Sequence, residues 1–348
     1  MTALKVGLIG YGIAGAVFHA PLLATNPNLR LDAVVTANPQ RQQQVRADHP
    51  DAAVVADMAG LLERDLDLVV VASPNRTHFE LTTAALDAGL PVVVDKPFVP
   101  TAQEGRALIE HAERVGQMLT VFQNRRWDND LRTLAALIDG GELGAVHRFE
   151  SRFERWVPTP KPGWRESGGV EEAGGVLYDL GSHLVDQALV LFGPVESVYA
   201  QVDLRRPGVE VDDDSFVALT HAGGVRSHLW MSKFAAQHGP RFRVLGDRAG
   251  FTKYGLDPQE TALREGRRPV DESWGAEPEE LWGELGTIDG GRRVPTLPGA
   301  YPAFYDSVVA ALRDGTAPPV DPADSVAGIE IIEAARRSAE KGTVERLR

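Results

Sequence analysis

Three ionisable side chains recur along GGVLYDLGSHLVDQ, residues 174–187: Asp179, His183 and Asp186. Their spacing of i, i+4 and i+7 places all three on one face of an α-helix, while leucines fill the other faces. A carboxylate near an imidazole is suited to acid–base chemistry. A half-buried helix capped by Asp179, with His183 hydrogen-bonded in the core, explains the same pattern. Metal ligation is a further reading, although the chain has no H-E-x-x-H motif.

Lys96 is a second candidate, because it ends the apolar run PVVVD and precedes Pro97. The proline restricts the backbone of Lys96, and doubly wound sheets bind ligands at the carboxyl ends of their strands. A surface lysine at a strand end is the alternative interpretation. The elements around both candidates must decide between chemistry and structure.

Composition excludes several classes of protein. The 348 residues are enough for two globular domains, and the absence of cysteine excludes disulfides, thiolate catalysis and cysteine-ligated metals. A net charge of −13 without a Lys/Arg-rich block argues against nucleic acid and anionic membranes as partners. MTALKVGLIGYG has no signal-like pattern, and no apolar run is long enough to span a membrane. We therefore expect a soluble, cytoplasmic protein.

A glycine motif, GYGIAG, follows directly on the short apolar strand KVGLIG. In this setting Gly10 allows the tight turn, Gly12 lets a pyrophosphate approach the backbone, and Gly15 lets helix and strand pack closely. The phosphates would lie at the helix N-terminus, near Ile13 and Ala14. The motif predicts dinucleotide binding; a purely structural turn is the alternative.

Alternating strands and helices follow the glycine motif. Valine-rich runs at 31–35, 52–55, 65–73 and 91–97 are separated by helical patterns near 39–48 and 77–88, and MLTVFQN adds a sixth strand. Short apolar strands joined by helices are typical of a parallel sheet covered on both faces. We predict a Rossmann domain over residues 1–122.

The end of the second strand indicates which nicotinamide cofactor is bound. An acidic residue there would bind the ribose 2′-hydroxyl of NAD, but this chain reads VVTANPQR. Thr36 and Asn38 are small hydrogen-bonding groups, and Arg41 can neutralise a 2′-phosphate, unless it is only a solvated helix residue. We expect NADP in preference to NAD. After the fourth strand, Asn75 and His78 of SPNRTH would contact the nicotinamide ribose, together with Ser73 and Pro74, although Asn75 also suits a turn.

The remainder of the chain has a different pattern. Six β-rich runs between 146 and 255 are separated by turns, with no crossover helix between them except the helix that contains Asp179, which predicts a largely antiparallel sheet. We expect an α+β domain over residues 123–348, for substrate binding and oligomerisation, with terminal helices near 301–314 and 323–341. The stretch 257–300, rich in Pro, Gly and charge, is interpreted as a long ordered loop over the substrate region or an interface.

The order of GYGIAG, ASPNRTHFE, VVVDKP and GGVLYDLGSHLVDQ resembles the Gfo/Idh/MocA family of sugar and polyol oxidoreductases over nearly the whole chain. HAPLL, QNRRWDND, YDLGSHLVDQ and YGLDPQE are similar to its NADP-dependent scyllo-inositol dehydrogenase group. The resemblance implies that Lys96, Pro97, Asp179 and His183 belong to the active site. It also implies homodimers or homotetramers, formed through the open face of the second sheet. The family commonly has Glu-Lys-Pro where this chain has Asp95-Lys96-Pro97, so the lysine is retained and the acidic residue is shorter by one carbon.

The resemblance implies hydride transfer from a secondary hydroxyl of a polyol or cyclic sugar to the nicotinamide. His183 then suits the base, Lys96 the cation beside the alkoxide, and Asp179 the group that orients the imidazole; which of Lys96 and His183 takes the proton stays open. The expected contacts of substrate hydroxyls are Asn124, Arg126, Trp127, Trp164, Arg165 and Tyr178. The alternatives are a noncatalytic NAD(P)-sensing regulator, anhydrosugar reduction and NAD-dependent glycoside cleavage.

Overall fold

The computed structural model describes residues 2–160, 168–169 and 172–347. The chain divides into two compact units, each built from three segments. Unit 1 comprises Met1–Asn124, Gln259–Trp274 and Ala300–Val326, and unit 2 comprises Arg125–Pro258, Gly275–Gly299 and Ala327–Arg348. The chain first passes from unit 1 to unit 2 after Asn124, close to the domain boundary expected after residue 122. A single boundary does not describe the whole chain, because two later segments belong to unit 1 again.

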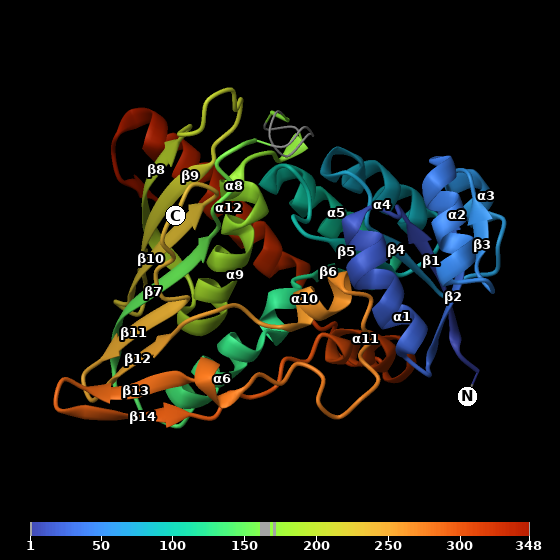
Figure 1. Cartoon of the computed structure of the whole chain (residues 1–348). Coiled ribbons are helices and arrows are strands. Elements are labelled where there is room, and N and C mark those ends of the chain that lie inside the picture. The colour runs from blue at the N-terminus through green and yellow to red at the C-terminus, as the bar shows by residue number, and fades with distance from the viewer. Residues whose placement is uncertain (1, 161–167, 170–171, 348) are drawn as a thin grey trace. The chain divides into compact units, whose positions relative to one another are not determined.

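Unit 1 is a parallel α/β unit, as the alternating pattern predicts. Within its described residues the six strands lie in the order β3-β2-β1-β4-β5-β6, and all of them are parallel. The strands are β1 (Leu4–Ile9), β2 (Leu29–Val35), β3 (Ala53–Val55), β4 (Leu68–Val71), β5 (Val92–Asp95) and β6 (Leu119–Phe122). The order reverses beside β1, so the crossover helices cover both faces of the sheet (Figure 1).

The helices of unit 1 are α1 (Ala20–Thr25), α2 (Pro39–Asp48), α3 (Met58–Leu62), α4 (His78–Asp87), α5 (Ala102–Val115), α10 (Gln259–Arg264) and α11 (Pro302–Asp314). Side-chain caps mark the starts of α2, α3 and α5. A π-helical segment, Ala14–His19, precedes α1. Thr101 and Glu104 form a reciprocal capping box at the start of α5, and Gly116 ends that helix with φ of 68°. The valines of β4 and β5 are completely buried, as expected for strands covered on both faces.

Unit 2 is built on a mixed, largely antiparallel sheet. Among the residues that the structure describes, nine strands lie in the order β14-β13-β12-β11-β7-β10-β9-β8-β15, and only the β7/β10 pair is parallel. The strands are β7 (Val146–Glu154), β8 (Val195–Asp203), β9 (Asp214–His221), β10 (Arg226–Ser232), β11 (Phe242–Gly246), β12 (Gly250–Lys253), β13 (Gly283–Thr287), β14 (Gly290–Val294) and β15 (Glu345–Arg346). The predicted fold class is confirmed for both units.

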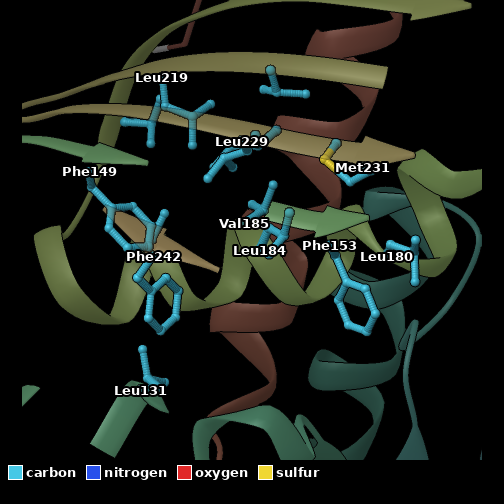
Figure 2. Packing of buried hydrophobic residues seen from close by; sticks show 14 of the residues in the cluster. Leu131, Phe149, Phe153, Leu180, Leu184, Val185, Leu219, Leu229, Met231 and Phe242 are labelled. Atoms are coloured by element: carbon cyan, nitrogen blue, oxygen red, sulfur yellow. The ribbon is translucent and has the colours of Figure 1, made fainter. Parts of the chain in front are cut away.

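One face of this sheet is covered by helix α9 (Gly181–Phe192). Figure 2 shows Leu184 and Val185 of α9 directed at Leu229 and Met231 of β10. Alternate residues of β9 are buried, as expected for a sheet with one face toward a core. Among the described residues, the other α-helices of this unit are α6 (Asn129–Asp139), α8 (Val176–Asp179) and most of α12 (Pro322–Lys341).

The interpretation of residues 257–300 as a long loop was wrong. This stretch contains α10 and the hairpin of β13 and β14, which extends the edge of the large sheet (Figure 1). Glycine and arginine supply most of β14, so no alternation of apolar residues marks it in the sequence. Of the helices in the described residues, none is both long and apolar enough to cross a bilayer.

Candidate active site

The glycine motif forms a turn that fits a dinucleotide. Gly10 has φ of 96°, and a Cβ there would lie 2.5 Å from the carbonyl oxygen of Ala72. A Cβ on Gly15 would lie 2.0 Å from the carbonyl oxygen of Gly10, so this position needs glycine for close packing. A Cβ on Gly12 would meet no atom within 4 Å, which leaves its backbone open to a ligand. Gly10 and Gly15 therefore have the tight turn and the close packing expected of them, and exposed Ile13 and neighbouring Ala14 begin the helical segment that follows.

Four neighbouring strands of unit 1 deliver candidate residues to one edge of the sheet. The order β2-β1-β4-β5 brings the carboxyl ends of these parallel strands together. Gly10 follows β1, Thr36 follows β2, Ser73 lies just beyond β4, and Lys96 follows β5. Cofactors of doubly wound sheets bind at this edge, where the strand order reverses. Asn124, which follows β6, is buried.

The residues after β2 are held by local hydrogen bonds. The Asn38 side-chain oxygen accepts hydrogen bonds from the backbone N–H groups of Gln40 and Arg41 at 2.9 and 3.1 Å, which caps α2. Thr36 is buried and its carbonyl oxygen accepts a hydrogen bond from Gln42. Arg41 lies exposed in the first turn of α2. The cap fixes the start of α2 and leaves the Arg41 guanidinium toward solvent.

His78 has a different environment from the one expected. Its side chain is fully buried, with Nδ1 lying 3.1 Å from the carbonyl oxygens of both Pro97 and Phe98 and Nε2 lying 3.0 Å from that of Ser73. The ring thus joins the loop after β4 to the loop after β5, and its nitrogens face the backbone instead of a ribose. Asn75 is also buried, in a 3₁₀ turn after exposed Pro74. His78 therefore supports the positions of Ser73 and Lys96, whose peptide bond to Pro97 is cis.

In unit 2 the stretch containing Asp179 and His183 forms two helices instead of one. Asp179 is the last residue of α8, and Leu180 separates it from α9. The backbone N–H of His183 bonds to the carbonyl of Leu180 at 3.2 Å, an i to i−3 bond. Asp179 is half-buried, and His183 is 4 % exposed, with its ring stacked on Phe153 at 6.4 Å between centroids. The break lies between the two candidate catalytic residues.

Asp186 forms an ion pair with Arg126. Nε and Nη2 of Arg126 donate to its two carboxylate oxygens, at 2.7 Å for the shortest contact, and both side chains are largely shielded from solvent. Arg126 was expected to bind substrate hydroxyls; the structure gives these two nitrogens a carboxylate partner within the chain. No group of three metal-ligating side chains occurs among the described residues.

Asp212 holds the start of α8, a role that the sequence analysis missed. The backbone N–H of Leu177 donates to its carboxylate at 2.7 Å, Ser215 Oγ donates at 3.1 Å, and its own carbonyl accepts the N–H of Val176. Burial raises the pKa of the Asp212 carboxyl, and these donors together with Arg336 lower it by less. The side chain lies so close that a Cβ on Gly175 would come within 2.0 Å of it. The acidic run VDDD before β9 is the only sequence signal for this contact.

The other expected substrate contacts have varied surroundings. Tyr178 is 1 % exposed, belongs to the hydrophobic cluster, and has the Arg336 guanidinium 5.0 Å over its ring, so its ring packs in the core instead of facing a ligand. Trp127 is half-buried at the end of a 3₁₀ turn. Trp164 and Arg165 lie outside the described residues.

Two family models cover most of the chain. Residues 4–123 match the NAD-binding Rossmann fold of an oxidoreductase family, and residues 135–346 match the C-terminal alpha/beta domain of the same family, GFO_IDH_MocA. Both matches agree with the folds of the segments they cover.

Relatives and solved structures give the same result. The chain is 39% identical to scyllo-inositol 2-dehydrogenase (NADP(+)) IolW of Bacillus subtilis, with 98% of this chain and 95% of the relative covered. It is 29% identical to D-glucoside 3-dehydrogenase of Escherichia coli, over 72% of this chain and 77% of the relative. The structure of the oxidoreductase yvaA from Bacillus subtilis matches with a TM-score of 0.94 at 36% identity, covering 100% of this chain and 99% of the other. The chain therefore belongs to the Gfo/Idh/MocA family and is an NAD(P)-dependent dehydrogenase with a Rossmann fold.

Proposed function

We propose that the protein transfers a hydride between NADP and one secondary hydroxyl of an uncharged polyol or cyclic sugar, with scyllo-inositol as the leading substrate. The main support is the position of Lys96, at the carboxyl end of β5 on the sheet edge that carries the glycine turn. A relative that covers nearly the whole chain is an NADP-dependent scyllo-inositol dehydrogenase.

The proposed chemistry divides between two side chains. The bound nicotinamide supplies the hydride acceptor. Lys96 binds the oxygen of the reacting hydroxyl and stabilises the negative charge that develops there, while His183 takes the proton. Asp179 orients the imidazole, and the stacked ring of Phe153 restricts its rotation. With these roles the hydroxyl loses its proton as the carbon gives up its hydride.

A substrate panel tests this proposal. Initial rates with NADP and NAD should be measured on inositols, aldoses and anhydroketoses, with Lys96→Ala as the negative control. We expect the highest kcat/KM on a cyclic polyol. Strict activity on an amino acid or a 2-hydroxy acid would refute the substrate class. Glycoside cleavage without net reduction of the cofactor, or cofactor binding without turnover of any compound, would refute the reaction.

The preference for NADP is tested at Arg41. No acidic residue occupies 36–38, and Arg41 lies exposed beside the cap of α2. Arg41→Ala should lower kcat/KM for NADP by about 10- to 100-fold, the value of one or two charge-assisted hydrogen bonds, and leave that for NAD unchanged. Arg46→Ala, on the exposed last turn of the same helix, is the matched control. Equal use of both cofactors by the unmodified protein would contradict the preference.

The face of the large sheet opposite α9 supports a homo-oligomer. Leu229 and Met231 of β10 face the core, so the intervening Trp230 faces the opposite side, where Arg152 lies 4.0 Å over its ring. We propose that this face joins copies of the chain. Light scattering should give a dimer or tetramer, and Trp230→Glu should shift the mass toward the monomer. A monomer at micromolar concentration would oppose this.

A further inference from the structure

A buried polar cluster includes Asp95, the residue before Lys96, and takes no part in the chemistry described above. His19 ends the π-helical segment, Asp95 ends β5, and Tyr305 lies on α11, all within unit 1. His19 Nδ1 is 2.6 Å from the hydroxyl of Tyr305, and His19 Nε2 is 3.5 Å from Oδ1 of Asp95. The side chains of His19 and Tyr305 are completely buried, and that of Asp95 is 16 % exposed. One imidazole therefore joins a buried phenol to the carboxylate that precedes Lys96.

The walls of the cluster are apolar. The His19 ring lies 4.3 Å from the ring of Phe122 between centroids, and Tyr305 packs against Phe122 and Phe304. An ionised carboxylate at the margin of such a site is costly unless cations or donors compensate it. The compensation has to come from the few polar groups present.

Those groups fix the charge of the cluster. Burial raises the pKa of the Asp95 carboxyl, but the neighbouring His19 imidazole and the ammonium group of Lys96 outweigh it, so this pKa lies below its ordinary value. Burial and the charge of Asp95 raise the pKa of the Tyr305 phenol well above its ordinary value. The phenol therefore keeps its proton and can donate it to His19 Nδ1, which directs the Nε2–H of the imidazole at Asp95.

We propose that His19, oriented by Tyr305, is a positioning residue for Lys96: it keeps the Asp95 carboxylate ionised and in one place, so that the lysine has a fixed counter-ion. This inference rests on the role of Lys96 in the proposed function. Without His19 the carboxylate loses its buried partner, takes up a proton more readily and releases the lysine from its place beside the reacting hydroxyl. Positioning errors of about 1 Å lower rates by about 100-fold.

Kinetics of four variants in the full-length protein test this inference. His19→Leu and Asp95→Asn should each lower kcat by about 10- to 100-fold, Tyr305→Phe by less, and none should change KM for the substrate by a similar factor. Because His19 acts through Asp95, the double variant His19→Leu/Asp95→Asn should be no slower than Asp95→Asn alone. The acidic limb of the kcat profile should move to higher pH in His19→Leu. His111→Leu, which removes the imidazole that lies 2.8 Å from Asp87 at the surface of the same unit, is the matched control.

Folding and cofactor binding are followed separately, by thermal melting and by fluorescence titration with NADPH. If His19→Leu does not fold, Tyr305→Phe retains the ring, and His19→Gln can still donate to Asp95; partial activity of His19→Gln supports the inference. Additive losses in the double variant, or an unmoved pH profile, would overturn it. Full activity of Lys96→Ala would overturn the proposed function together with this inference. An inactive Lys96→Ala beside a fully active His19→Leu would overturn the inference alone.

Discussion

Asp95 and Asp212 are both shielded carboxylates behind candidate catalytic residues, yet their environments differ. Asp95 ends β5 beside Lys96, and the cations around it hold its pKa below the ordinary value despite burial. Asp212 caps α8, the helix that Asp179 ends, and burial keeps its pKa above the ordinary value despite its donors. The polar neighbours of Asp95 are His19 and Lys96, whereas those of Asp212 are mainly neutral hydrogen-bond donors.

The difference separates two uses of an acidic residue. Beside Lys96 the negative charge itself is the useful property, since the charge of Lys96 acts on it. At the start of α8 the useful property is an oxygen that accepts the N–H of Leu177, which a neutral amide also provides. The same replacement, aspartate by asparagine, should therefore have different consequences at the two positions.

The largest effect is expected from the residues that these carboxylates support. Lys96→Ala and His183→Ala should each lower kcat by about 100- to 10,000-fold, the usual contribution of a positioned acid–base group. NADPH affinity should hardly change, because the glycine turn holds the phosphates. Steady-state rates and fluorescence titration check both statements. The double variant should lose much less than the product of the single losses, and a fully multiplicative loss would show that the two groups act independently.

Asp179→Asn asks whether a carboxylate on α8 takes part in the chemistry. If Asp179 orients His183, kcat should fall by about 10- to 100-fold with an unchanged melting temperature. An amide at the end of α8 keeps the size of the side chain and removes only its charge. Normal kcat for this variant would assign Asp179 a purely structural role and leave Asp95 as the one carboxylate that supports catalysis.

Asp212 should contribute to stability mainly through the hydrogen bonds it accepts and less through its charge. Asp212→Ala leaves the Leu177 N–H and the Ser215 hydroxyl without their acceptor, at a cost of about 1 to 3 kcal/mol in the free energy of unfolding. Asp212→Asn retains an oxygen at the same place and should cost less than about 1 kcal/mol. Urea denaturation of both variants measures the difference. If asparagine were as damaging as alanine, the charge would matter at α8 as well.

The smallest expected effect is a pair of opposite pH dependences. The pKa of Asp95 is lowered on folding, so its stabilising contribution is present above the ordinary value of 3.8 and is lost as the pH falls through the folded-state pKa. The pKa of Asp212 is raised, so its contribution is full below 3.8 and is lost as the pH rises through the folded-state pKa. The stability of the unmodified protein relative to Asp95→Asn should rise with pH, and that relative to Asp212→Asn should fall. Denaturation from about pH 3 to 8 measures how each stability difference changes with pH. Slopes of the same sign for the two variants would contradict the comparison.

The sequence predicts the parts of the molecule whose signals are local. The valine run of β5, the glycines after β1 and the alternation in β9 each lie within a few consecutive residues, and the structure has strands or turns at all three places. Lys96 was proposed as a candidate from the same kind of signal, a strand end followed by proline, and it does follow β5. Local patterns also gave one helix across 179–183, because helical spacing does not reveal the break at Leu180.

The supporting contacts could not be predicted from local patterns. His19 and Tyr305 are 286 residues apart, and Asp212 lies 35 residues beyond the N–H group that it accepts. Each joins elements that are far apart in the sequence. His78 shows the opposite error: its place after β4 suggested a ligand contact, but the packing of the next loop against it decides its partners.

The π-helical segment gives unit 1 an unusual sensitivity to chain length. In it the N–H of Ala20 bonds to the carbonyl of Gly15, five residues back, so the segment holds one residue more than an α-helical turn would. Deleting a single residue between Gly15 and His19 would restore α-helical bonding. It would also rotate the glycine loop by about 100° around the helix axis relative to His19. Relatives that differ here by an insertion or a deletion would thus lose the register between phosphate binding and the Asp95 cluster, even with every side chain conserved. Changes of length in this segment should be selected against more strongly than changes of residue type.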